Sequence, residues 1–303
     1  MREYTLAPEP VTQTTAFSAL TFSTLERHLV VESDASEILD YLSSAYRRLL
    51  VPAFDVDSSV KPADAGRIAA VPEQRWLSFN GADVKYDDDD VSTNFRRSFY
   101  GASKLFRLSF QRNPDWHSLY GAAVCVGGKA VLLSAQSGIG KTTLALSMLA
   151  RGATLYSDEF VFLRRSDLTV SGLPRALMIR ERSLSMCPDP RLREVCLRSK
   201  PRIPHGDRVW DTIDAGEVFG EEVFAQPAPL AAAIILERSQ TESVVVERIA
   251  PALAAADFTK RFNAEIKGFE RLALVAQLFA TTPCYRLIAR SPDVAAQAIE
   301  KLL

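Results

Sequence analysis

The sequence predicts an α/β fold for the C-terminal part of the chain, preceded by a separate α+β region. From about residue 119 onward, short apolar runs that are typical of buried strands alternate with patterns of helical period. One of these strands passes through a glycine-containing loop directly into a helix. The first 115 residues lack this alternation and mix short apolar runs with polar breaks. We therefore divide the chain into an N-terminal region of unknown role, residues 1–115, and a second domain, residues 116–303.

The N-terminal region contains one clear helical pattern. Apolar side chains recur at helical spacing over Ile38–Leu50, and Pro52 ends the pattern because proline lacks the N–H that a helix needs. Val51–Pro72 is rich in proline and glycine, which predicts a loop or linker. Trp76–Phe79 is predicted to be a strand. The four aspartates Asp87–Asp90 indicate a solvated loop, because they lack the spaced ligands of a calcium-binding loop.

The second domain is predicted to alternate strands with helices. Gly127–Gly128 indicates a hairpin turn, and Gly152 stands where a glycine often ends a helix. The basic, proline-interrupted segment Lys200–Arg208 is predicted to be a mobile loop, either covering a substrate or without function. The predicted strands are Ala122–Val126, Ala130–Leu133, Thr154–Tyr156, Phe160–Leu163, Leu230–Leu236, Val244–Ile249 and Tyr285–Ala289, and the predicted helices are Thr142–Arg151, Pro251–Asn263, Phe269–Ala280 and one from Pro292.

Composition argues against several classes of protein. The 303 residues carry a formal net charge of -1, which gives no general attraction to nucleic acid or to an anionic membrane. Four cysteines and three histidines are scattered without a CxxC pair, so neither a structural zinc site nor a disulfide framework is expected. No apolar run approaches the roughly 18–20 residues of a membrane span, and the N-terminal residues lack the apolar stretch of a signal peptide. We expect a cytoplasmic protein that binds neither nucleic acid nor membranes.

The loop Ala135–Thr142 carries the most informative motif. Its sequence AQSGIGKT fits the phosphate-binding pattern GxxxxGK[ST], except that alanine occupies the first glycine position. Gly138 and Gly140 let backbone N–H groups turn inward toward an anion, and the helix N-terminus adds partial positive charge. Lys141 is expected to reach the β- and γ-phosphates, and Thr142 to ligate Mg²⁺. The motif predicts binding of ATP with Mg²⁺ by Ala135, Gln136, Ser137, Gly138, Ile139, Gly140, Lys141, Thr142 and Thr143.

Alanine at position 135 is the one departure from this motif. It costs about 1 kcal/mol or more if the position needs a positive φ, and little otherwise.

An acidic pair, Asp158-Glu159, lies only one helix and one strand beyond Lys141. If the strand near Thr154–Tyr156 packs beside Ala130–Leu133, its C-terminal end brings the pair to the phosphate loop, at the sheet edge where α/β proteins bind ligands. A carboxylate there can orient Mg²⁺ or accept a hydroxyl proton. The alternative is that Ser157 and Asp158 only form a turn.

The run Leu132–Leu146, followed by Leu149–Glu159, resembles the HPr kinase/phosphorylase family. The shared features are SGxGK[ST], a helix that ends in Arg-Gly and an acidic pair at this distance. The chain looks more similar still to relatives of the family that act as peptide-tail kinases in lasso-peptide clusters, and to other HPr-kinase-related proteins. The resemblance covers about Tyr120–Leu303 and is strong over Val124–Val161. It implies a carboxykinase-like P-loop fold and ATP-dependent phosphorylation of a serine hydroxyl.

The resemblance also implies roles for single residues. Lys141 would be catalytic, and Asp158 and Glu159 would form the acidic pair that includes the catalytic base. Glu159 stands where HPr kinases have aspartate, so we favour Asp158 as the base and, with Thr142, as a Mg²⁺ ligand. The segment Pro174–Ser183 would place a basic residue near the nucleotide, and Arg180 is our candidate.

Two departures from the family limit what it implies. Family members carry a histidine at the start of the strand that leads into the loop, where this chain has Tyr120; His117 lies three residues earlier. Tyrosine can hydrogen-bond a phosphate but is not cationic near neutral pH. The glycine- and asparagine-containing C-terminal signature of HPr kinases is absent. HPr itself is therefore not predicted to be the substrate.

The leading hypothesis from the sequence is an ATP-dependent kinase that acts on a serine or threonine hydroxyl of a peptide or protein. A small-molecule kinase is one alternative, because the same site would serve a smaller acceptor. The other is a regulatory nucleotide-binding protein in which Ala135, Tyr120 and Glu159 weaken catalysis. The oligomeric state is open, with a homo-oligomer among the expectations.

Overall fold

The computed structural model describes residues 17–25, 27–51, 64–69, 77–84, 94–186, 189–198, 203–205, 208–261 and 268–303. The chain forms two compact units. The first unit comprises Met1–Leu42 and Val51–Ala102, and the second comprises Ser43–Leu50 and Ser103–Leu303. The domain boundary predicted after residue 115 stays a prediction, and it did not anticipate that the short segment Ser43–Leu50 groups with the C-terminal part.

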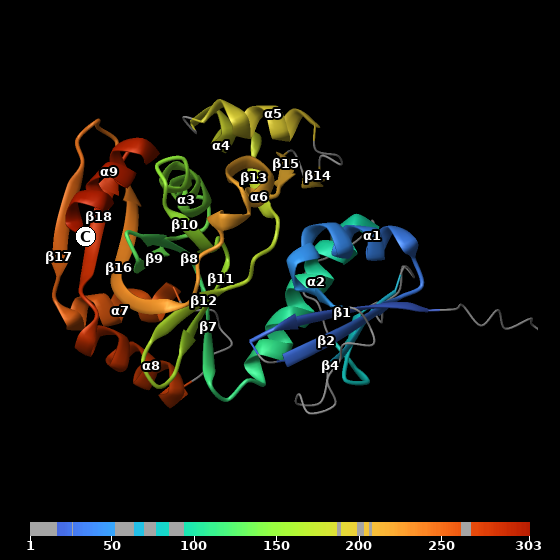
Figure 1. The fold of residues 1–303 in the computed structure, drawn as a ribbon. Helices are drawn as coiled ribbons and strands as arrows, with labels where there is room; N and C mark the ends of the chain where they lie inside the picture. The colour runs from blue at the N-terminus through green and yellow to red at the C-terminus, as the bar shows by residue number, and fades with distance from the viewer. Residues whose placement is uncertain are drawn as a thin grey trace, which may run out of the picture. The chain divides into compact units, whose positions relative to one another are not determined.

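The first unit is built on a mainly antiparallel sheet (Figure 1). Within it β2 (Arg27–Ser33) lies between β1 (Ser18–Thr24), to which it is antiparallel, and β4 (Asp64–Ile68), to which it is parallel. The sheet continues through β5 (Leu77–Phe79) and β6 (Ala82–Asp83). Buried apolar residues at alternating positions of β2 and on one side of α1 (Ser36–Ala45) form the local core; they include Leu29, Val31, Ile38 and Leu42.

Two expectations for this region were wrong in part. The predicted helix Ile38–Leu50 ends at Ala45, because Tyr46 leaves helical geometry (φ −119°, ψ 25°) before a 3₁₀ turn, η1 (Arg47–Leu49), and a short strand, β3 (Leu50–Val51). The predicted loop Val51–Pro72 contains strand β4, since pairing on both sides outweighs the low strand propensity of Gly66.

Other expectations for this region had different outcomes. The strand predicted at Trp76–Phe79 is confirmed as β5, and Asp87–Asp90 lies outside the described residues. Helix α2 (Asn94–Gln111), which the sequence did not predict, runs from the first unit into the second.

The second unit contains a nine-stranded sheet among the described residues. Strands are ordered β10-β8-β9-β16-β12-β11-β7, and β18 also pairs with β16 and carries β17 on its other side. The long strand β16 is parallel to both β9 and β18 and antiparallel to β12. The strands are β7 (Trp116–Tyr120), β8 (Ala122–Val126), β9 (Lys129–Ser134), β10 (Thr154–Ser157), β11 (Phe160–Arg164), β12 (Thr169–Gly172), β16 (Ala228–Arg238), β17 (Val245–Ile249) and β18 (Cys284–Ala289).

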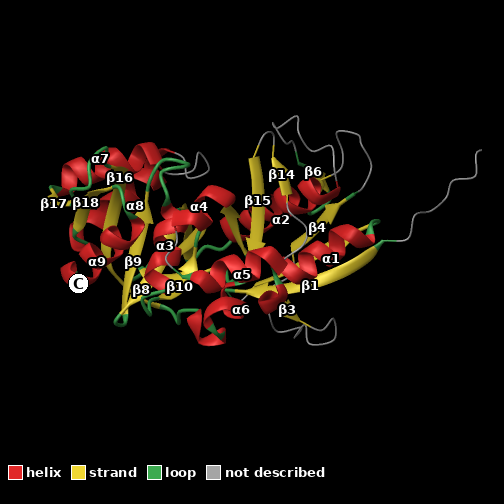
Figure 2. Ribbon diagram, turned by 90° about the horizontal axis from the view of Figure 1, so that it is seen from above, coloured by secondary structure: helices red, strands yellow, loops and turns green. Residues whose placement is uncertain are grey.

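Helices cover both faces of this sheet (Figures 1 and 2). Helices α3 (Lys141–Leu149) and α9 (Pro292–Leu302) pack on one face, and α7 (Pro251–Arg261) and α8 (Gly268–Thr281) pack on the other. Alternate residues of β9 belong to the two cores: Val131 and Leu133 face α3 and α9, whereas Ala130 and Leu132 face α7 and α8. This double burial explains why the strand is a continuous apolar run. The mixed α/β class predicted from the sequence is confirmed.

A smaller three-stranded sheet, ordered β13-β15-β14, belongs to the same unit. Its strands are β13 (Leu177–Arg180), β14 (Ile203–His205) and β15 (Arg208–Ile213), and the elements beside it are α4 (Glu181–Met186), α5 (Pro190–Arg198), α6 (Ala215–Phe219) and η2 (Glu221–Val223). The mobile loop predicted at Lys200–Arg208 is therefore wrong at Ile203–His205, which pair with β15.

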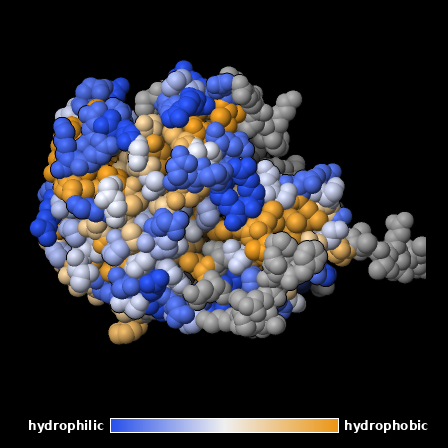
Figure 3. Space-filling model, in the orientation of Figure 1, coloured by the Kyte–Doolittle hydropathy of each residue, from blue (hydrophilic) through white to orange (hydrophobic). Residues whose placement is uncertain are grey.

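Strand β17, at one edge of the large sheet, exposes the apolar side chains of Val245 and Val246. Figure 3 shows hydrophobic surface over the part of the second unit that carries β17 and β18, where Val244, Val245 and Val246 are exposed. None of the helices in the described ranges has the length and apolar character that crossing a membrane requires.

Candidate functional site

The loop between β9 and α3 has the backbone that phosphate binding requires. Gly138 and Gly140 have φ values of 84° and 124°, which side chains with a Cβ rarely adopt. Gly140 precedes α3 and supplies no side-chain cap, so the first N–H groups of the helix have no capping side chain as acceptor. These N–H groups and the helix dipole suit an anion at the start of α3.

Ala135 fits the loop without backbone strain. It is absent from the non-glycine residues with positive φ, which in the described part of the chain are Leu25, Asn80 and Leu168. Its side chain is buried in the core beneath α3, and its carbonyl accepts a hydrogen bond of 3.0 Å from Lys141 Nζ. The departure from glycine therefore carries little conformational cost.

Tyr120 contacts the lysine of the loop. Lys141 is 7% exposed, and its Nζ lies 4.9 Å from the centre of the Tyr120 ring, a cation–π arrangement. Burial raises the pKa of Tyr120, and the charges of Glu159 and Asp158 raise it further. His117 is buried three residues earlier on β7, opposite Leu163. The sequence left open whether Tyr120 or His117 takes the place of the histidine of HPr kinases. In the structure Tyr120 is the one that contacts Lys141.

The acidic pair reaches the phosphate loop by a different strand arrangement from the expected one. Strand β10 pairs with β8, so the predicted direct pairing of β10 beside β9 was wrong. Strand β8 is antiparallel to both, because it forms a hairpin with β9, and β9 and β10 therefore run in the same direction. Their C-terminal ends lie at one sheet edge, where Thr142 Oγ1 donates to Asp158 Oδ2 at 3.4 Å.

The segment that carries the pair is also a turn. The Ser157 hydroxyl accepts from the backbone N–H groups of Glu159 and Phe160 at 3.3 and 3.0 Å. The sequence left two alternatives open, a simple turn at Ser157 and Asp158 or a carboxylate beside the phosphate loop. The structure contains both.

A buried arginine, Arg175, binds both members of the acidic pair. Its side chain is 3% exposed, and its Nη2 donates to Asp158 Oδ1 at 3.4 Å and to Glu159 Oε2. Asp158 is 7% exposed, and burial raises the pKa of its carboxyl while the charge of Arg175 opposes the rise. From the sequence we selected Arg180 in the segment Pro174–Ser183, which also contains Arg175.

Arg180 lies against the phosphate loop from β13. A Cβ added to Gly138 would lie 3.6 Å from Arg180 Nη1, which places the guanidinium beside the loop backbone. The remaining predicted loop residues differ in exposure: Gln136 and Ser137 are exposed, Ile139 is half-buried and Thr143 is buried. The loop therefore carries Lys141, has Arg180 beside Gly138, and meets the carboxylate of Asp158 at Thr142.

The oxygen atoms beside the loop suit magnesium. The described residues contain no group of three or more His, Cys, Asp or Glu side chains arranged to hold a metal. Mg²⁺ is commonly held by one or two protein oxygens together with phosphate and water oxygens. Thr142 Oγ1 and Asp158 Oδ2, 3.4 Å apart, fit such a partial set of ligands.

Comparisons with known proteins give one partial relationship. No family model matches the chain. Two HPr kinase/phosphorylases, from Clostridium botulinum strains Eklund 17B and Alaska E43, are each 43% identical to it over 54 residues, 18% of this chain and 18% of theirs. The chain thus matches less than a fifth of the length of these relatives. The solved structure of the Hpr(Ser) kinase/phosphatase from Coxiella burnetii is 14% identical, with a TM-score of 0.32 over 61% of this chain and 93% of that chain. One segment of the chain is therefore similar in sequence to HPr kinase/phosphorylase.

Proposed function

We propose that this chain is an ATP-dependent, HPr-kinase-like enzyme that transfers the γ-phosphoryl group to a serine or threonine hydroxyl of a peptide or protein. One observation carries the proposal: a buried carboxylate, Asp158, lies between the hydroxyl of Thr142 on the phosphate loop and the guanidinium of Arg175. A phosphate loop alone would support nucleotide binding. A carboxylate at its magnesium-ligating threonine supports chemistry on the terminal phosphate.

The residues divide the work as follows. The N–H groups at the start of α3 and the ammonium of Lys141 hold the phosphates, and Thr142 and Asp158 would hold Mg²⁺, which supplies positive charge against the phosphate oxygens. Asp158 would accept the acceptor's proton as the acceptor oxygen bonds to phosphorus and the bond to ADP breaks. Arg175 keeps both carboxylates aligned. Glu159 is the alternative base, because its side chain is more exposed, at 26%.

A carboxykinase-like P-loop domain remains our proposal for the fold of the second unit. The sheet with helices on both faces and the loop between β9 and α3 support it. Ala135, one of the departures that favoured a catalytically weak regulatory protein, adopts no left-handed backbone, and this supports the enzyme over that alternative.

The test is phosphoryl transfer from radiolabelled ATP, with Mg²⁺, to a panel of serine- and threonine-containing peptides and proteins. Release of ADP with a metabolite panel tests a small-molecule acceptor in parallel. We expect a labelled polypeptide from the wild type and a loss of about 10²–10³-fold in Lys141→Ala, which lacks the ammonium that faces the transferred charge. Lys129→Ala, on β9 and outside the site, is the matched control. A Lys141→Ala variant as active as Lys129→Ala would exclude this loop as the active site.

A further inference from the structure

Tyr120 lies at the end of a strand, directly beside the acidic pair. It is the last residue of β7 and pairs with Phe160 of β11, the residue that follows the acidic pair. The next residue, Gly121, donates its N–H to the carbonyl of Glu159 at 3.0 Å. Strand pairing therefore fixes the backbone of Tyr120 next to the turn that carries the two carboxylates.

A close approach to β9 fixes the same backbone from another side. A Cβ added to Gly121 would lie 3.0 Å from the carbonyl oxygen of Leu133 and 3.4 Å from Leu132 Cδ1, so the chain after Tyr120 lies directly against β9. Strand β9 leads into the phosphate loop. Tyr120 is thus held relative to the phosphate loop as well as to the acidic pair.

The ring of Tyr120 lies under the ammonium of Lys141. Nζ is 4.9 Å from the ring centre, a distance at which a cation is attracted to the electron-rich face of an aromatic ring. Nζ also donates to the Ala135 carbonyl at 3.0 Å, and Lys141 is only 7% exposed. The attraction is stronger where water is excluded. Ring and carbonyl are both neutral, so neither of them cancels the positive charge that phosphates would meet.

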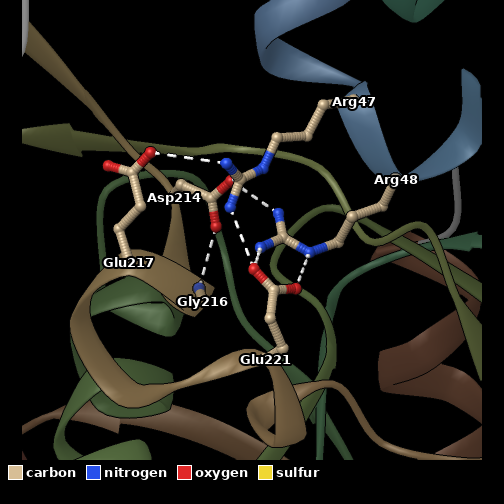
Figure 4. Close-up of polar contacts among 6 residues, drawn as sticks. All are labelled: Arg47, Arg48, Asp214, Gly216, Glu217 and Glu221. Atoms are coloured by element: carbon tan, nitrogen blue, oxygen red, sulfur yellow. Dashed lines mark hydrogen bonds and ion pairs between the residues drawn. The ribbon is translucent and has the colours of Figure 1, made fainter.

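Another cation of the same unit is held by charged groups (Figure 4). Arg48, in the turn η1, forms a two-point pair with Glu221, Nε to Oε2 at 2.9 Å and Nη2 to Oε1 at 2.6 Å, and its Nη1 binds Asp214 Oδ2 at 2.5 Å. Its guanidinium carbon also lies 4.2 Å from the centre of the Phe224 ring. Paired carboxylate contacts of this kind are strong and directional. The Phe224 ring therefore covers a cation that two carboxylates already hold, which makes it a control for the ring of Tyr120.

We propose that Tyr120 is a positioning residue of the phosphate site, and that the face of its ring, not its hydroxyl, holds the Lys141 ammonium ready for the terminal phosphates of the nucleotide. The ring restricts a flexible side chain before nucleotide arrives, so less side-chain freedom is lost on binding. The Ala135 carbonyl is then the contact that a phosphate oxygen replaces. This role rests on the proposed function, because it needs nucleotide at the loop, but the contact between ring and ammonium does not.

The test measures Mg-ATP affinity by isothermal titration calorimetry in variants that separate the ring from the hydroxyl. Tyr120→Phe keeps the ring and should bind Mg-ATP as the wild type does, whereas Tyr120→Leu should bind about tenfold more weakly. Phe224→Leu, the matched control, should keep wild-type affinity because Asp214 and Glu221 still hold Arg48. Equal losses in Tyr120→Phe and Tyr120→Leu, wild-type affinity in Tyr120→Leu, or an equal loss in Phe224→Leu would overturn the proposal.

A series of ring substituents tests the same contact while keeping the shape of the side chain. Fluorine withdraws electrons from the face of the ring, so mono-, di- and trifluorinated phenylalanine at position 120 should weaken Mg-ATP binding stepwise. A ring that only fills space would leave the affinity constant along the series. Constant affinity would overturn the proposal even if Tyr120→Leu does not fold.

A double-mutant cycle with Lys141→Met, which removes the ammonium, separates this inference from the proposed function. Its readout is the melting temperature, which needs neither nucleotide nor turnover. If the ring acts on the ammonium, Tyr120→Leu should lower the melting temperature less in Lys141→Met than in the wild type, and additive losses would overturn the inference even in an active kinase. Coupled losses with ring-dependent Mg-ATP binding, in a chain that transfers no phosphoryl group, would sustain the inference and reject the proposed function. A wild type that binds no Mg-ATP would reject both.

Discussion

Two carboxylates at one turn have different surroundings. Asp158 is buried between Thr142 and Arg175, whereas Glu159 is partly exposed and shares only the arginine. We predict that Asp158→Asn lowers kcat by about 10²–10⁴, because an amide cannot accept the acceptor's proton. Glu159→Gln should lower it less. Steady-state kinetics at saturating Mg-ATP provide the measurement.

The result assigns the base directly. Should Glu159→Gln be the slower variant, Glu159 accepts the proton and the assignment to Asp158 was wrong. Wild-type rates in both variants would leave the pair with a structural role only.

The first and fourth positions of the phosphate loop, Ala135 and Gly138, differ in whether their backbone conformation requires glycine. Gly138 has a φ of 84° and lies beside Arg180, whereas Ala135 has no positive φ. We predict that Gly138→Ala weakens Mg-ATP binding, because alanine resists this conformation by about 1–2 kcal/mol, roughly tenfold in affinity. Ala135→Gly should not tighten binding, and should lower stability by about 0.5–1 kcal/mol through the more flexible unfolded chain.

Isothermal titration calorimetry of the two variants separates these expectations. Tighter nucleotide binding in Ala135→Gly would mean that alanine weakens the loop after all. That result would favour the alternative of a regulatory nucleotide-binding protein with weak catalysis.

At the scale of elements, apolar pattern and glycine position were enough to predict seven strands of the large sheet around the loop, but not β7 and β12. Both faces of β9 are buried, so its apolar run was unambiguous, and the phosphate loop followed from its motif. Strand β4 was missed because its pairing with β2 and β5, and not its own composition, makes Gly66 part of a strand. Helix α1 was predicted too long because Arg47 and Arg48 turn toward acids more than 160 residues away.

The same distinction applies to the candidate site. Asp158 was found because it is close in sequence to the loop. Arg175 was not assigned, since its contacts with Asp158 and Glu159 depend on long-range packing that no local spacing reports.

A further prediction at the scale of elements comes from the close approach of Gly172 in β12 to Tyr156 in β10. A Cβ on Gly172 would overlap the carbonyl group of Tyr156, and backbone atoms cannot yield as a flexible side chain can. We predict that Gly172→Ala lowers the free energy of unfolding by about 2–4 kcal/mol. Because Tyr156 lies just before the acidic pair, turnover should fall as well.

Gly128→Ala is the matched control for this variant. Gly128 has a φ of 80° but nothing within 4 Å of an added Cβ, so only the backbone strain of about 1 kcal/mol applies. Melting temperatures should therefore fall further for Gly172→Ala than for Gly128→Ala. The reverse order would contradict the close approach of the two strands.

At the scale of the whole molecule, the second unit is discontinuous in sequence, because the residues from 103 onward are completed by Ser43–Leu50. A chain that begins at Asn94 keeps all of α2 but loses Tyr46, Arg47 and Arg48. We predict that its melting temperature is lower by roughly 10 °C, since loss of a buried aromatic side chain alone removes about 3–5 kcal/mol. Its turnover should fall with it, because Ala176, the neighbour of Arg175, loses the backbone hydrogen bond of 2.8 Å that it donates to Ala45.

Two comparisons determine whether the segment causes this loss. In the full-length chain, Arg47→Gln with Arg48→Gln should reproduce part of it, because these changes remove the ion pairs with Asp214 and Glu221 but leave the ring of Tyr46 in the chain. A synthetic peptide of residues 36–51, added to the shortened chain, should restore part of the melting temperature and of the turnover. A shortened chain as stable and active as the full one would show that Ser43–Leu50 is dispensable. The stabilising role that we assign to Ser43–Leu50 would then be incorrect.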